Sequence, residues 1–194
     1  AAAVFAVMVI SIGILYHVAL VPCLIASLSA YFLAGALGVQ PVRFAVQVPE
    51  ASAMTFFQVG FLGILCALVS ILFCMMMHGA EKGMRKILPN AWLRVLAGAG
   101  IIIVLTYLCG TNDYNGVGMG VIVAAIEEGK AEPLAFLLKL VFTSVTLAAG
   151  FKGGEIVPSF FVGAAFGCVI APIIGLPAGF GAAVGLVSVF CGVT

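Results

Sequence analysis

Charge is the property that this sequence has least of. Asp, Glu, Lys and Arg make up 8% of its 194 residues, whereas 64% are hydrophobic. A soluble domain usually carries roughly 25% charged residues. The formal net charge is only +1, which leaves no basic surface of the kind that binds nucleic acid. The composition therefore excludes a nucleic-acid-binding protein and predicts a multi-pass membrane protein.

Patterns of metal-binding or catalytic residues are also missing. The six cysteines have no C-x-x-C or Cys/His spacing, so we interpret them as small packing residues: Cys23, Cys66, Cys74, Cys109, Cys168 and Cys191. His17 and His78 lie far from each other and from Ser159 in the sequence, and a nucleophile needs a base beside it. We therefore expect no metal, no cofactor and no enzymatic activity. A membrane-embedded enzyme and a purely structural scaffold are the alternatives.

Apolar runs separated by glycine, proline or charged residues predict a series of membrane helices. Residues 53–78 are free of charge for about 26 residues, which at 1.5 Å per residue gives about 39 Å against a hydrocarbon core of about 30 Å. Such a helix should tilt in the membrane, and Ser52 is a plausible N-cap for it. The predicted helices are residues 1–15, 18–37, 53–78, 91–109, 134–149, 159–174 and 178–191.

The few charged residues gather in short stretches. One stretch around Pro89 holds Glu81, Lys82, Arg85, Lys86 and Arg94. By the positive-inside rule this short loop faces the cytoplasm, and residues 38–52 and 110–120 then face the opposite side. Lys139 stands apart in an apolar segment, where a cation is costly unless it pairs or reaches the interface.

A glycine-rich turn followed by an apolar helix is the most informative stretch. Residues 148–167 read AAGFKGGEIVPSFFVGAAFG. Proline fits the start of a helix because its missing N–H would have no partner there. The free N–H groups just before Pro158 lie at the positive end of the helix dipole, which attracts anions. In a membrane, irregular backbone is tolerated where it lines a cavity, so we predict a broken helix that starts at a buried anion-binding cavity.

At these residues the sequence resembles the CLC family of chloride channels and proton-coupled anion antiporters. That family carries a G-G-x-x-x-P signature at the start of a half-helix whose amides bind the central anion. The resemblance implies a halide-binding site made by the matching residues, Gly153, Gly154, Glu155, Ile156, Val157 and Pro158. It continues through the small residues Gly163, Ala164, Ala165 and Gly167.

The resemblance also implies an architecture. The fold class is all-α: a polytopic membrane protein with tilted and broken helices and a CLC-like inverted repeat, of which residues 1–194 supply most of the second half. They would form an incomplete CLC-like transmembrane domain truncated at both ends. The expected partners are a halide, protons, the lipid bilayer and a second copy of the protein, with residues 18–37 contributing to the homodimer. The expected location is a bacterial plasma membrane.

Glu155 leaves two hypotheses open. Chloride-specialised members of the family usually have an apolar residue at this position, whereas a glutamate resembles the fluoride-exporting branch. A protonated Glu155 could donate a hydrogen bond to fluoride or carry a proton. Alternatively, Glu155 complements the helix dipole, pairs with Lys152 and faces away from the pore. Val157 stands where the fluoride branch often has threonine, and no carboxylate precedes Glu50, which argues against ordinary chloride/proton exchange.

Overall fold

The computed structural model describes residues 17–38 and 44–193, and the helices it contains belong to two separate units. The first unit, residues 1–43, contributes α2 (His17–Ala36), which confirms the helix predicted at 18–37. Its described side chains are almost all exposed, and Pro22 lies within it. The helix predicted at residues 1–15 lies outside the described residues.

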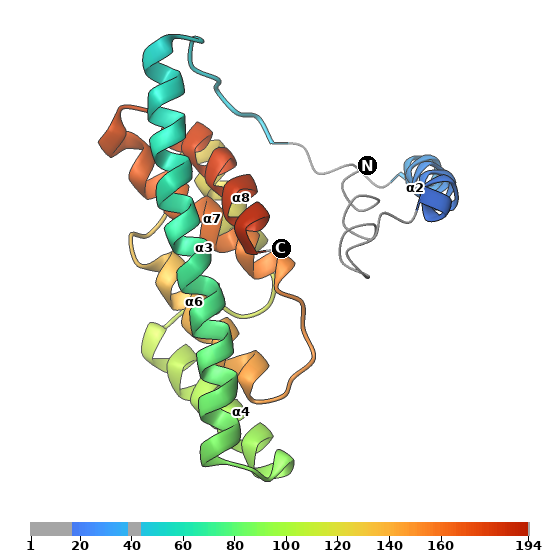
Figure 1. Ribbon diagram of the computed structural model, residues 1–194, viewed down its shortest axis with the longest axis vertical. Helices are drawn as coiled ribbons and strands as arrows, with labels where there is room; N and C mark the ends of the chain where they lie inside the picture. Colours follow the sequence, from blue (N-terminus) through green and yellow to red (C-terminus); the bar gives the residue numbers. More distant parts are fainter. Residues whose placement is uncertain (1–16, 39–43, 194) are drawn as a thin grey trace. The chain divides into compact units, whose positions relative to one another are not determined.

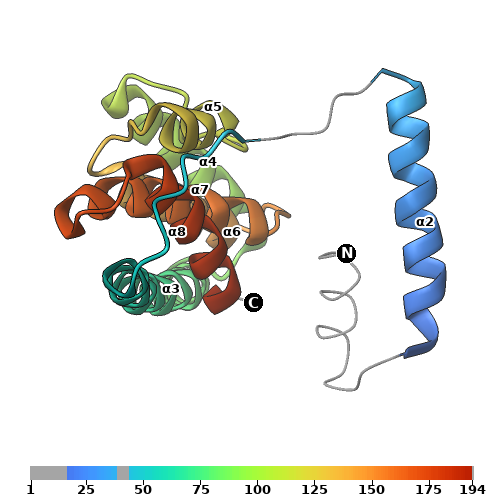
Figure 2. The same cartoon turned by 90° about the horizontal axis from the view of Figure 1, so that it is seen from above.

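The second unit, residues 44–194, holds the remaining elements, and its described part is helical without a strand (Figures 1 and 2). Its α-helices are α3 (Ala53–Ile87), α4 (Ala91–Cys109), α5 (Met119–Val123), α6 (Ala135–Ala148), α7 (Ile156–Ile170) and α8 (Ala178–Val193). A π-helix, η1 (Ala124–Glu128), continues α5, and a 3₁₀ turn, η2 (Ala171–Ile174), continues α7. These bounds confirm the all-α prediction.

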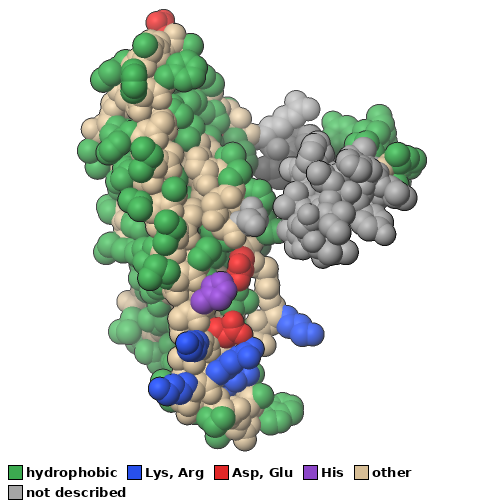
Figure 3. All heavy atoms as spheres, viewed as in Figure 1, with side chains coloured by type: hydrophobic (Ala, Val, Ile, Leu, Met, Phe, Trp, Pro, Cys, Tyr) green, Lys and Arg blue, Asp and Glu red, His purple; other side chains and the backbone are tan. Residues whose placement is uncertain are grey.

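Helix α3 is longer than the sequence predicted. Its start is as expected, because the Ser52 hydroxyl accepts a hydrogen bond from the Thr55 N–H at 3.2 Å. The prediction that it ends at His78 and gives way to a loop was wrong. No helix breaker occurs before Pro89, the Glu81 carboxylate pairs with Arg85 one turn later at 2.7 Å, and basic side chains in the last turn complement the helix dipole. The charged cluster therefore lies largely on the helix (Figure 3).

Helices α7 and α8 approach so closely that their backbones touch. A methyl group on Gly163 would lie 2.3 Å from the Gly185 carbonyl oxygen, and one on Gly167 would lie 2.1 Å from that of Gly181. Only glycine permits this approach, which is a common way for membrane helices to associate. Seen from above, α7 and α8 lie between α3 and α5 (Figure 2).

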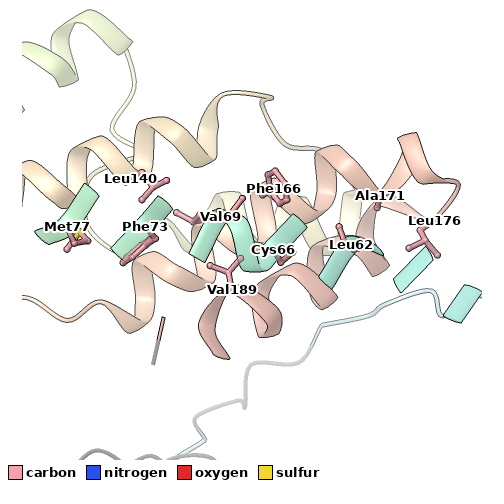
Figure 4. Packing of buried hydrophobic residues seen from close by; sticks show 11 residues of the cluster. Leu62, Cys66, Val69, Phe73, Met77, Leu140, Phe166, Ala171, Leu176 and Val189 are labelled. Atoms are coloured by element: carbon pink, nitrogen blue, oxygen red, sulfur yellow. The ribbon is translucent and has the colours of Figure 1, made fainter. Parts of the chain in front are cut away.

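Helix α3 lies along α6 and α8 and closes one side of the core. Its apolar side chains Leu62, Cys66 and Phe73 are fully buried and face Phe166 of α7 and Val189 of α8 (Figure 4). Within residues 17–38 and 44–193, three segments are long and apolar enough to cross a membrane: α3, α4, and α7 together with η2. On the face seen in the space-filling view, hydrophobic side chains are spread over the upper part and the charged side chains gather mostly below (Figure 3).

We expect alanine at Gly163 or Gly167 to destabilise the protein, because the added methyl group would push the two backbones apart. Overpacking of this kind costs about 1–3 kcal/mol. The measurement is the thermal unfolding midpoint of the detergent-purified full-length protein. Gly60→Ala and Gly100→Ala are the matched controls, since nothing lies within 4 Å of a methyl group at either position. Equal midpoints in all four variants would contradict direct backbone packing.

We also expect the two ends of α4 to lie on opposite sides of the membrane. A cysteine replacing Lys86 should react with an impermeant thiol reagent only from the cytoplasmic side, and one replacing Thr111 only from the other side. The native protein treated in the same way is the control. Reaction of position 86 from outside the cell would overturn the orientation given by the positive-inside rule.

Candidate functional site

A tight turn after α6 brings the chain back to start α7. The Gly150 N–H donates to the Leu147 carbonyl at 3.0 Å, and the Phe151 N–H donates to that of Thr146 at 3.3 Å. Gly150 has φ +100°, a conformation that L side chains rarely adopt. The turn thus closes α6 and leaves residues 152–155 as irregular backbone leading into α7.

The N–H groups of residues 152–157 have no acceptor within the described residues. Backbone pairing in α7 begins only with the Ser159 N–H, which donates to the Glu155 carbonyl at 3.0 Å. Glu155 is the N-cap residue, yet its side chain forms no capping hydrogen bond. Pro158 has no N–H, and the buried Ser159 hydroxyl is used within the helix, where it donates to the Ile156 carbonyl at 2.6 Å. A row of free donors therefore stands at the positive end of the α7 dipole.

A cavity of about 540 Å³, here called the α7 cavity, lies against these donors. Five of the six predicted site residues line it: Gly153, Gly154, Ile156, Val157 and Pro158. The other walls come from α6, through Lys139, Phe142, Thr143, Thr146 and Leu147, and from residues 114–117 of the loop between α4 and α5. The structure thus brings the glycine-rich turn together with a loop some 40 residues earlier, which the sequence did not indicate.

Lys139 is a charged residue of this cavity that the sequence interpretation did not assign to the site. Its side chain is 2% exposed. Its ammonium donates to the carbonyl oxygens of Tyr114 at 3.0 Å and Gly116 at 2.6 Å, and lies 5.0 Å from the centre of the Phe161 ring. No carboxylate in the described parts of the chain pairs with it. The signal that could have found it was a lone lysine in an apolar helix, a pattern that marks ion paths in membranes.

Two features of the start of α7 bear on the hypotheses for this stretch. Glu155 and Lys152, which one of the two hypotheses pairs, form no ion pair; the pairs found in the described residues are elsewhere. The first residues of the helix are also partly exposed, Ile156 to 43% and Val157 to 37%. The helices that pack on α7 cover its later turns, where Ser159 and most of the following residues are buried. The α7 cavity is therefore open at this edge, and the Glu155 side chain does not line it.

Comparison with known proteins gives a consistent result. The family model for voltage gated chloride channels matches residues 1–194. The chain is 33% identical over 198 residues to the "Chloride/fluoride channel protein" of Pseudomonas syringae pv. tomato, covering 99% of this chain and 44% of that protein. A solved structure of a CLC-type fluoride/proton antiporter matches with a TM-score of 0.87 and 32% identity, covering 98% of this chain and 49% of the other. The chain spans about half the length of the relatives it matches.

The geometry at the start of α7 leads to a prediction about Pro158. Replacement by leucine should weaken halide binding about tenfold, or about 1.4 kcal/mol. Leucine supplies an N–H and lets α7 extend backwards, which would shift the free N–H groups away from the cavity. The measurement is calorimetric halide binding to the full-length protein, with Pro177→Leu before α8 as the matched control. Unchanged binding in Pro158→Leu would count against the helix-start site.

Proposed function

Because the chain belongs to the CLC family of voltage gated chloride channels, we propose that the protein carries halide ions across a membrane and binds them at the start of α7. The site consists of Gly153, Gly154, Glu155, Ile156, Val157 and Pro158. The proposal places residues 1–194 within the second half of a CLC transmembrane domain. It makes the protein a transporter rather than an enzyme.

The observation that carries the proposal is the row of unpaired N–H groups of residues 152–157 beside the α7 cavity. The first N–H groups of a helix have no partner within the helix, and a ligand can supply one. A halide accepts such hydrogen bonds and brings the negative charge that the helix dipole favours. Neutral donors replace part of its hydration shell without a full opposite charge, so binding stays weak enough for release.

Lys139 supports the same proposal through its charge. It is buried and hydrogen-bonded to carbonyl oxygens, and no carboxylate of the described residues pairs with it, so it adds a positive potential to the α7 cavity. A charge in a low-dielectric wall is weakly screened and acts over a longer range than one at the surface. Lys139 would thus raise the local concentration of anions without coordinating them.

A second candidate function is fluoride/proton antiport. The matched solved structure is described as a fluoride/proton antiporter, and the curated relative is named a chloride/fluoride channel. Glu155 at the N-cap is the residue of this chain that favours the fluoride version. Its exposed side chain lies beside the α7 cavity without lining it. In this function Glu155 would turn toward the cavity to deliver a proton or a hydrogen bond to the anion.

Assembly and location complete the proposal. Apolar side chains of α2 such as Ile25, Leu28 and Phe32 are 55–70% exposed, which fits a helix that contacts lipid or a second copy of the protein. We propose a homodimer in which α2 takes part, within a bacterial plasma membrane. The three apolar segments of the second unit agree with an integral, multi-pass membrane protein.

The experiment is halide efflux from liposomes that contain the full-length protein, with chloride and fluoride compared with and without a pH gradient. Glu155→Gln is measured beside the unmodified protein, and Glu50→Gln, an exposed carboxylate just before α3, is the matched control. Fluoride efflux that drives protons and is lost only in Glu155→Gln would support antiport. Chloride efflux that is unchanged by the pH gradient and by Glu155→Gln would support a chloride channel. Absence of efflux of either halide would overturn the proposal.

A further inference from the structure

The loop between α4 and α5 lines a second cavity besides the α7 cavity. This cavity of about 830 Å³, here called the loop cavity, is lined by residues that include Asp113, Tyr114, Lys130, Glu132, Cys168 and Pro172. Tyr114 is the one described residue that lines both cavities. Tyr114 is therefore the residue at which the two cavities share a wall.

Tyr114 is held in place at both ends of its side chain. Its ring is 5% exposed and packs against Phe142 at 5.7 Å and edge-on against Phe161 at 6.2 Å between ring centres. Its hydroxyl donates to the Glu132 carboxylate at 3.0 Å. A buried tyrosine gains from apolar packing and needs an acceptor for its O–H, and this site supplies both.

The backbone around Tyr114 is held separately. Lys139 binds the Tyr114 and Gly116 carbonyls, and the Asn115 amide donates to the Thr106 hydroxyl at 3.1 Å. Gly118 has φ +69° and lies so close to Phe161 that a methyl group there would stand 2.6 Å from the ring. The loop backbone is thus held by contacts that do not involve the Tyr114 side chain, so a substitution of that side chain leaves these contacts in place.

Burial raises the pKa of the Tyr114 hydroxyl to about 12, and the hydrogen bond to Glu132 and its negative charge add to this effect. The hydroxyl therefore stays protonated throughout the neutral range. It remains a donor to Glu132 under any condition in which transport would be measured.

We propose that Tyr114 is a positioning residue that closes the α7 cavity toward the loop cavity, with Glu132 as the acceptor that holds it closed. The inference rests on the proposed function, because it takes the α7 cavity as the anion site. Loss of the hydrogen bond frees the phenol ring to swing, and loss of the ring joins the two cavities. Tyr114 then decides whether an ion at the start of α7 has a route into the loop cavity.

The test is the rate at which an impermeant methanethiosulfonate reagent modifies the full-length protein carrying Thr146→Cys. Thr146 lines the α7 cavity only. Cys168 is replaced by alanine because it lines the loop cavity, and the same protein with Thr146 retained gives the background. Tyr114→Ala should raise the rate at least tenfold when the reagent is added on the side of Thr111. Tyr107→Ala, which removes an exposed tyrosine on α4, should leave the rate unchanged.

The hydrogen bond is tested by conservative variants that keep the packing. Tyr114→Phe and Glu132→Ala should each raise the rate a few-fold, and the double variant should show no further increase because both remove one bond. Glu132→Gln should behave as the unmodified protein, because its amide oxygen still accepts from the hydroxyl. If Tyr114→Ala fails to fold, these variants decide the question. Equal rates in Tyr114→Phe, Glu132→Ala and Glu132→Gln would overturn the proposal.

Halide efflux measured on the same samples separates this inference from the proposed function. If the protein transports halide but substitutions of Tyr114 and Glu132 leave the modification rate unchanged, the closure is rejected and halide transport is not. If the modification rates of the Tyr114 and Glu132 variants change as expected but the protein transports no halide, the closure is supported and the proposed function is rejected. The modification reports on the connection between cavities whether or not an anion passes through it.

Discussion

Direct contact between the backbones of α7 and α8 is the constraint on which the rest of this structure depends. Side chains between two helices leave room for adjustment, but glycine facing a carbonyl oxygen leaves almost none. Helix α7 is therefore fixed along its later turns, where its residues are buried. Its first turn projects beyond this packed region with its N–H groups unpaired. The proposed anion site would therefore need no reorganisation when the ion arrives.

Charged side chains of this protein occur in contrasting surroundings, among them the end of α3 and the buried wall of the α7 cavity. In the cluster around the end of α3, Glu81 pairs with Arg85 and the Lys82 and Lys86 side chains are exposed, whereas the Arg94 Nε atom is buried without a hydrogen-bond partner among the described residues. Lys139 is different, since it is buried and bound to carbonyls. Its two hydrogen bonds tie α6 to the loop at residues 114–116, so one side chain holds a wall of the α7 cavity and supplies its positive potential.

Local signals in the sequence predicted most helices to within a few residues. Ser52 caps α3 as expected, and the apolar run 91–109 is α4. The error at the end of α3 has a clear cause: charged residues were interpreted as a loop although nothing among them breaks a helix. The pair of Glu155 and Lys152 that one of the two hypotheses included does not form, because sequence proximity says nothing of side-chain direction in an irregular turn. The role of Glu155 in the site stays a prediction.

By itself, the sequence determined the class of the protein and the position of its motif. Scarce charge and long apolar runs require a helical membrane protein, and glycines before Pro158 require a helix start with free N–H groups. These are local properties of the chain. Only the tertiary structure decided what faces that start: residues 114–117, the buried Lys139 and a second cavity behind Tyr114. Lys139, for example, donates to carbonyls 25 and 23 positions earlier, and such contacts depend on how the helices pack, which local patterns do not encode.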